Sequence, residues 1–201
     1  MPNCCIGKFG GESMTLLYLG ILLFGGSHFF SEMFPAVRNR LQARLGEQSY
    51  KGTYSIISLV GLVLLGWGYV QTRNNGVLLY EPVAGAAHVT LLLVLIGFVL
   101  ISSFHGKGYI RKFVQNPFSW GVLLWSLGHL LANGKVAVVL IYGLLFVISV
   151  VDIAVNMARG NRPVYEPRIR SDIIAVVAGV VIYLLAGLVF HPYVLGVPVL
   201  Q

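Results

Sequence analysis

Residues 84–104 read AGAAHVTLLLVLIGFVLISSF and contain no Lys, Arg, Asp or Glu. About 20 apolar residues in a helix are enough to cross the hydrocarbon core of a bilayer. In a water-soluble protein, a helix that is apolar on every side would have to be covered completely by other elements. The stretch therefore predicts a transmembrane helix, and similar stretches recur along the chain.

The whole chain has the composition of an integral membrane protein. Hydrophobic residues make up 57% of its 201 residues, and charged residues make up only 10%. Ordinary globular domains contain about 25% charged residues. A soluble domain of this size could not cover its surface with so few charged side chains. We therefore expect an all-α fold, a polytopic bundle of about six helices with the lipid bilayer around it and no water-soluble domain.

Six apolar stretches predict the spans. Their bounds are residues 14–34, 53–70, 84–104, 118–131, 136–155 and 173–191. The fourth rises only about 21 Å against a core of roughly 30 Å, so a re-entrant segment is an alternative to a full crossing. Residues 1–13 form a polar tail, and Met14 is an alternative start of the chain. The transmembrane domain is expected to cover residues 14–201.

The basic residues alternate between the two sides of the membrane. Most of the 14 Lys and Arg fall in the loops after the first, third and fifth spans, namely Arg38, Arg40, Arg44 and Lys51, then Lys107, Arg111 and Lys112, then Arg159, Arg162, Arg168 and Arg170. Cytoplasmic loops carry such an excess. We therefore expect both termini outside the cytoplasm, which means periplasmic termini if the chain lies in a bacterial inner membrane. Because the charges lie in loops and form no continuous basic face, nucleic acid is not an expected partner.

The loop after the first span also contains a helical pattern. Val37, Leu41 and Leu45 recur at helical spacing, and arginines lie between them. This arrangement predicts a short amphipathic helix at the membrane surface, anchored to anionic lipid.

Ionisable residues inside a bilayer are costly and are therefore functional candidates. The candidates are His28, Glu32, His88, His105, His129, Asp152 and His191. His105 and His191 lie at the ends of spans and are expected at the interface. Glu32, one helical turn after His28, is expected either to orient that ring or to meet Arg38 or Arg40. Asp152 is expected to pair with Arg159 or another arginine of its loop.

The three deep histidines follow small residues. His28 follows Gly25-Gly26-Ser27, His88 follows Gly85-Ala86-Ala87, and His129 follows Gly128. Small neighbours leave room beside an imidazole for a flat macrocycle, but they also permit close helix packing. Two histidines on facing helices can bind a haem iron within a helix bundle. The pattern leaves haem binding and packing both open.

Two longer motifs lie in or beside the spans. Residues 44–55 read RLGEQSYKGTYS, and residues 125–134 read WSLGHLLANG. Together with Ser27-His28 and Ala87-His88, they make the chain similar to the NnrU family of membrane proteins, from Met14 to the fifth span. The resemblance implies a role in denitrification, the reduction of nitrite and nitric oxide, with membrane respiratory proteins as partners.

The related ζ-carotene isomerases share this domain. In them a haem b bound by histidine is implicated in the cis–trans isomerisation of a carotenoid, and the histidines match His28 and His129. The resemblance therefore implies haem b with these two residues as iron ligands, and His88 is the rival of His28 by depth. A cysteine of the isomerases is Ser126 here. Carotenoid isomerisation and a non-catalytic scaffold or assembly role are the alternatives to denitrification.

The entry to the fourth span departs from the pattern of relatives. Related proteins and the membrane methyltransferases often have Arg-His-Pro there, whereas this chain has Gln115-Asn116-Pro117. Methyl transfer from S-adenosylmethionine is therefore not expected.

Overall fold

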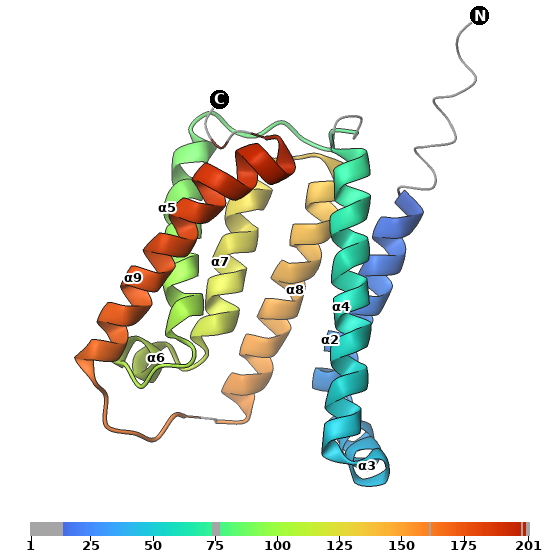
Figure 1. Ribbon diagram of the computed structural model, residues 1–201, viewed down its shortest axis with the longest axis vertical. Coiled ribbons are helices and arrows are strands. Elements are labelled where there is room, and N and C mark those ends of the chain that lie inside the picture. The colour runs from blue at the N-terminus through green and yellow to red at the C-terminus, as the bar shows by residue number, and fades with distance from the viewer. Residues whose placement is uncertain (1–13, 74–76, 161, 198, 200–201) are drawn as a thin grey trace, which may run out of the picture. The chain divides into compact units, whose positions relative to one another are not determined.

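The computed structural model describes residues 14–73, 77–160, 162–197 and 199. The predicted tail at residues 1–13 lies outside the described residues. Among them, the long helices predicted from the apolar stretches are present (Figure 1). Five are long and apolar enough to cross a membrane: Met14–Met33, Glu47–Thr72, Ala86–Ser103, Val136–Ala158 and Ile169–Leu195. The protein is therefore an all-α, multi-pass membrane protein.

The predicted fourth span is also a helix, α7 (Pro117–Ala132), but it has only 16 residues. Asn116 precedes it and Pro117 occupies its first turn, where a missing backbone N–H costs nothing. The helix rises about 24 Å, so it is shorter than the hydrocarbon core. The short fourth helix is as predicted, and its full crossing stays a prediction.

The chain forms two compact units, each described by itself. Unit 1 contains residues 1–80 and 135–144, and unit 2 contains residues 81–134 and 145–201. The helix α8 (Val136–Ala158) contributes its first part to unit 1 and its remainder to unit 2.

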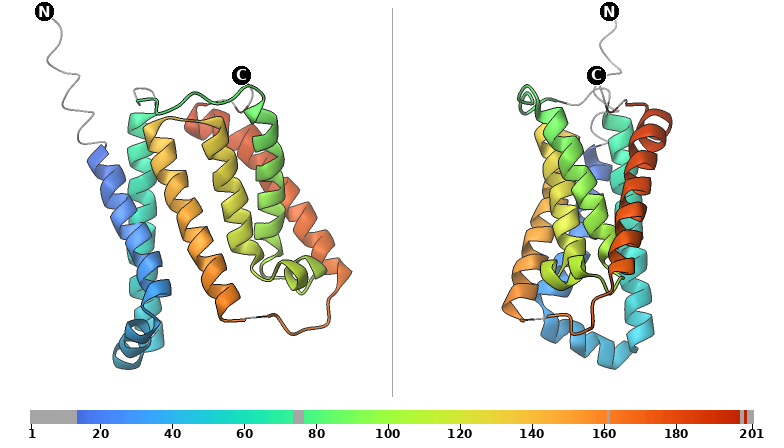
Figure 2. Two further views of the ribbon diagram at one scale, coloured as in Figure 1. Left: turned by 180° about the vertical axis from the view of Figure 1, so that it is seen from behind. Right: turned by 90° about the vertical axis from the view of Figure 1, so that its left-hand side faces the viewer.

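In unit 1, the first helix packs closely on α4 (Glu47–Thr72), and Figure 2 shows them side by side. A Cβ on Gly61 would lie 2.5 Å from the backbone nitrogen of Phe24, so only glycine permits this approach. The first helix contains the π-helical segment η1 (Ile21–Gly25) and continues as α2 (Gly26–Met33). Leu17, Leu65 and Ala137 form the buried centre.

The helix predicted after the first span is present as α3 (Pro35–Leu45), and its anchoring at the membrane surface stays a prediction. It ends at Gly46, whose φ of +83° is a backbone conformation that favours glycine. The helix packs against α4.

In unit 2, α5 (Ala86–Ser103) packs against both α7 and α9 (Ile169–Leu185) (Figure 1). A Cβ on Gly97 would lie 2.8 Å from the carbonyl oxygen of Gly121 in α7. A Cβ on Gly179 of α9 would lie 2.6 Å from the Cα of Val99. Small residues let membrane helices approach closely and gain dispersion contacts, which replace the missing hydrophobic drive in lipid.

The last span differs from its predicted bounds. The apolar run was expected to end at His191, because Pro192 follows and proline removes a helical hydrogen bond. Instead, the helix continues beyond Leu185 as the π-helical segment η2 (Ala186–Leu195), with Pro192 inside it. A π-helical turn holds more residues than an α-helical turn, so it redirects the side chains that follow.

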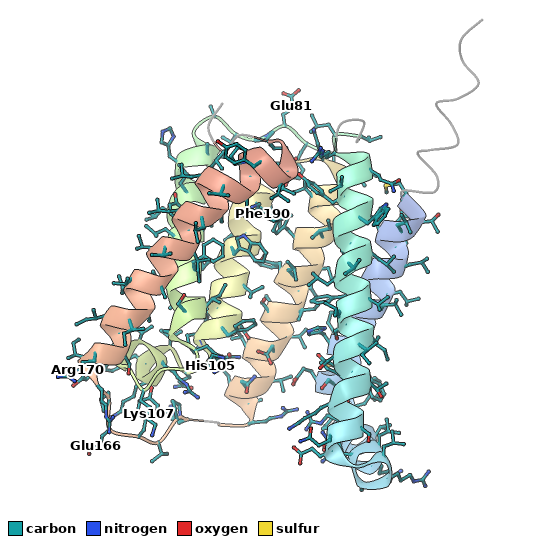
Figure 3. All side chains as sticks on the ribbon, viewed as in Figure 1. Glu81, His105, Lys107, Glu166, Arg170 and Phe190 are labelled. Atoms are coloured by element: carbon teal, nitrogen blue, oxygen red, sulfur yellow. The ribbon has the colours of Figure 1, made fainter. Side chains whose placement is uncertain are left out.

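The basic loops after the third and fifth predicted spans lie at one end of unit 2. Figure 3 shows His105, Lys107, Glu166 and Arg170 at this end and Glu81 at the other. The short helix α6 (Tyr109–Val114) joins α5 to α7 here. This grouping agrees with the loop alternation predicted from the basic residues, and the orientation in the cell stays a prediction.

Candidate functional site

His28 lies on α2, directly after η1. Its Nδ1 is 2.7 Å from the carbonyl oxygen of Phe24. A carbonyl can only accept, so Nδ1 carries the hydrogen and Nε2 is the atom that can accept or ligate. The imidazole is flanked by Phe24, with ring centres 4.3 Å apart, and by Tyr54 of α4, at 5.6 Å.

His129 has the same local arrangement on α7. Its Nδ1 is 2.9 Å from the carbonyl oxygen of Trp125, so Nε2 is again the atom that can accept a hydrogen bond or ligate. The Trp125 ring meets the imidazole edge-on at 5.7 Å. Ser126, which stands where the isomerases have cysteine, is fully buried and donates to the carbonyl of Leu123.

The imidazole of His191 faces His129 in unit 2. The two ring centres are 6.1 Å apart and the planes are tilted by 35°. Metal–nitrogen bonds are about 2.0–2.1 Å long, so two imidazoles that share one metal have ring centres about 6 Å apart. His191 lies in the π-helical segment η2, beside His129, and its expected place at the membrane interface stays a prediction. Proline directly after a histidine in an apolar stretch was the signal available for this irregularity.

The remaining candidate histidines lie elsewhere. His88 is exposed at the beginning of α5, about 200° around the helix from Thr90, which donates to the carbonyl of Gly128 in α7. His105 is exposed just after the end of α5, where an interfacial residue was predicted. His28 lies in unit 1 and His129 in unit 2, so their pairing on one iron stays a prediction.

The glycines beside the histidines serve different purposes. A Cβ on Gly25 would lie 2.7 Å from Leu144, and one on Gly128 would lie 3.3 Å from Thr90. These two glycines therefore permit close packing. A Cβ on Gly26 would meet nothing within 4 Å, so open space lies next to His28.

Glu32 does not hold Nδ1 of His28. That nitrogen is bonded to the backbone of Phe24, so the tautomer of His28 is set without Glu32. Glu32 itself is half-buried on the same helix. A contact between Glu32 and the Nε2 side of the ring stays a prediction.

Asp152 is held by neutral donors rather than by the arginine predicted for it. Its carboxylate accepts hydrogen bonds from Asn116, Ser119 and Asn156. Asn116 begins α7 and Ser119 lies in its first turn, so this carboxylate ties α7 to α8. The prediction was wrong because the long arginine side chains of the loop can extend to water, whereas the two Asn amides and the Ser119 hydroxyl are within hydrogen-bonding distance of the carboxylate.

The residues fit a haem better than a metal ion held by the protein alone. Among the described residues, no group of three or more His, Cys, Asp or Glu side chains could hold a metal ion. Structural zinc sites take four protein ligands. A haem iron needs only one or two, because the porphyrin supplies the other four nitrogens. The Nε2 atoms of His28 on α2 and His129 on α7 could meet that requirement.

Comparison with known proteins agrees with the sequence motifs. The NnrU protein family model matches residues 16–199, which is nearly the whole chain. Among curated proteins and solved structures, none matches this chain. The apolar helices and the extent of the family match together show that the chain is a membrane protein of the NnrU family.

Proposed function

We propose that this NnrU-family protein binds haem b through His28 and His129 and supports the reduction of nitrite and nitric oxide in a bacterial inner membrane. The observation that supports haem binding for both residues alike is the shared tautomer of the two imidazoles. In each ring, Nδ1 donates a hydrogen bond to the carbonyl oxygen four residues earlier, so Nε2 is the atom that could bind iron. The nitrogen-oxide role rests on the family resemblance.

The residues around the two imidazoles suit this task. Haem b held by two histidines would supply one-electron chemistry. The rings of Phe24 and Tyr54 beside His28, and of Trp125 beside His129, make both surroundings apolar. The backbone bonds fix each ring in one tautomer, which keeps the ligand atom in place.

His191 is the rival of His28 as second ligand. Its ring centre lies 6.1 Å from that of His129 within one unit, which is close to the separation that a shared metal requires. Both ligand sets contain His129, so this residue is common to every haem arrangement that the geometry supports.

Absorption spectroscopy tests haem binding and assigns the ligands. The protein is purified in mild detergent from haem-sufficient cells, and oxidised and reduced spectra are recorded. We expect a b-type spectrum that is lost in His129→Ala and in His28→Ala, and kept in the exposed control His105→Ala. Loss in His191→Ala with an unchanged His28→Ala spectrum would move the second ligand to unit 2. A folded wild-type protein without haem would overturn the proposal.

Growth tests the physiological role separately. The gene is deleted in a host that respires nitrite, and the deletion strain is complemented with the wild-type gene or with the His129→Ala variant. We expect nitrite consumption to be restored by wild type only. Normal nitrite and nitric oxide turnover without the gene, together with an intact haem spectrum, would reject the nitrogen-oxide role and favour carotenoid isomerisation.

Orientation has its own test. A reporter fused after Gln201 is expected to read periplasmic, because six crossings return the chain to its starting side. A cytoplasmic reading would mean an odd number of crossings and would overturn the predicted topology.

A further inference from the structure

Unit 1 contains a groove between the first helix, α3 and α4. Its volume is about 330 Å³, and its walls include Leu22, Phe30, Leu41, Leu45, Tyr50 and Tyr54. That volume lies at the lower end of the range for small-molecule sites, which are mostly apolar with a few placed polar groups. The haem residue His28 is not among the lining residues, although its neighbour Ser27 is.

One polar atom in this groove is unsatisfied. The hydroxyl oxygen of Tyr50 is buried, and within the described residues it has no hydrogen-bond partner. Two other hydroxyls of the groove donate to nearby backbone carbonyls: the Ser27 hydroxyl donates to Phe24, and the Thr53 hydroxyl donates to Ser49. A buried hydroxyl without a partner costs free energy, so an occupant with an acceptor oxygen at Tyr50 would be favoured over a pure hydrocarbon.

The helix beside the groove is strongly basic. α3 contains Arg38, Arg40 and Arg44 and no acidic residue. Leu41 and Leu45 of the same helix line the groove; Arg44 follows Leu41 by three residues and therefore lies on the same side of the helix, and Arg40 lies one turn before Arg44. Arg40 and Arg44 are exposed, and the carboxylate of Glu47, the nearest acid after them, is paired with Lys51 at 2.6 Å. Basic side chains on a surface helix attract anionic lipid headgroups.

We propose that this groove is a binding site for one anionic phospholipid. An acyl chain lies along the apolar wall, an ester carbonyl oxygen accepts the hydrogen bond of the Tyr50 hydroxyl, and the phosphate lies near Arg40 and Arg44. The three features match the three parts of such a lipid. The proposed lipid contacts do not use His28 or His129, although Tyr54 of the groove wall also packs on the His28 ring.

Lipid binding is measured by native mass spectrometry of the full-length protein after delipidation in detergent. Phosphatidylglycerol and phosphatidylcholine with identical acyl chains are titrated in parallel. We expect phosphatidylglycerol to bind at least tenfold more tightly to the wild type. The Arg40→Gln, Arg44→Gln double variant should bind both lipids equally, because only the charge attraction differs between them.

Tyr50→Phe tests the hydrogen bond. It keeps the ring and removes only the hydroxyl, so the fold should persist, and we expect roughly fivefold weaker binding of both lipids. Tyr193→Phe, at an exposed position of unit 2, is the matched control and should bind as the wild type does. Leu41→Trp fills the groove and should abolish saturable binding.

Three results would overturn the proposal. One is equal affinity of the wild type for the two lipids. Another is unchanged binding in Tyr50→Phe when its elution profile and melting temperature match those of the wild type. The third is a polyene or other hydrocarbon that competes with phosphatidylglycerol and binds Tyr50→Phe as well as wild type, which would assign the groove to an apolar substrate.

Discussion

Removing the carboxylate of Asp172 should loosen one end of unit 2. Asp172 lies in the first turn of α9 and is only 8% exposed. Its two oxygens accept hydrogen bonds from the backbone N–H groups of Tyr109, at 2.8 Å, and Ile110, at 3.1 Å. These N–H groups begin α6, where helices leave donors unsatisfied and favour negative charge. One side chain of α9 therefore holds the connection between α5 and α7.

The size of the effect follows from the two bonds. A hydrogen bond to a charged group contributes about 1.5–3 kcal/mol, and an unpaired buried donor adds a penalty. Taking the lower value for each bond, Asp172→Ala should lower the free energy of unfolding by roughly 3 kcal/mol. For a chain of this size, 1 kcal/mol corresponds to about 2–4 °C, so the melting temperature should fall by roughly 6–12 °C. Asp172→Asn keeps one acceptor oxygen and should lose about half as much.

Thermal unfolding in detergent, with matched lipid content, measures this shift. Glu166→Gln, which removes an exposed carboxylate from the same end, is the control and should shift the midpoint by less than about 1 °C. Gly108→Ala approaches the contact from the other side, because its Cβ would run into the Asp172 carboxylate. If the melting temperature of Asp172→Ala equals that of the control, the carboxylate does not hold α6, and the reasoning from its two hydrogen bonds is wrong.

Three further outcomes are expected. Gly61→Leu should destabilise unit 1 by roughly 1–3 kcal/mol in thermal unfolding, because the new side chain meets the backbone of Phe24, whereas Gly52→Leu, which has open space, should be nearly neutral. Asp152→Ala should lower the free energy of unfolding by roughly 3 kcal/mol, because the Asn116 amide and the Ser119 hydroxyl lose their acceptor, whereas Asn156 keeps its bond to the backbone carbonyl of residue 152; a melting temperature within 1–2 °C of the wild type would contradict this. Burial raises the pKa of Tyr165 above its ordinary value of 10.0, against an opposing effect of the Arg111 guanidinium. Its neutral hydroxyl donates to Gly108, so that hydrogen bond should persist through neutral pH and be lost only as pH rises above 10; ultraviolet difference titration against Tyr165→Phe measures this.

Span positions could be predicted from the sequence because the bilayer sets one length scale. A run of about 20 apolar residues has few alternatives, so the helices Ala86–Ser103 and Val136–Ala158 begin and end close to the predicted bounds. Helix ends that extend into polar residues were harder to predict. α4 begins at Glu47 rather than near residue 53, because Glu47 and Lys51 pair one turn apart on its exposed first turns.

Contacts between distant residues could not be predicted in the same way. The apolar pattern gives the face of a regular helix, and it fails where η2 changes the number of residues per turn and brings His191 to His129. Two of the three donors to Asp152, Asn116 and Ser119, are more than 30 residues away, and no spacing in the sequence relates them to it. Tyr50 belonged to a motif that indicated the family, but only packing shows that its hydroxyl is buried without a partner.

The two haem candidates are not equally informative about function. A hydrogen bond from Nδ1 to the carbonyl four residues earlier is local, and any histidine inside a helix can form it, so this bond alone orients a ring without selecting a ligand. For His129 there is an additional, non-local feature, because an imidazole from another helix, 62 positions away in sequence, faces it. For His28 the non-local neighbour is the ring of Tyr54, which packs but cannot ligate through a nitrogen. His129 is therefore the residue whose loss should remove haem in every arrangement considered, and the comparison of His28→Ala with His191→Ala decides which helix completes the site.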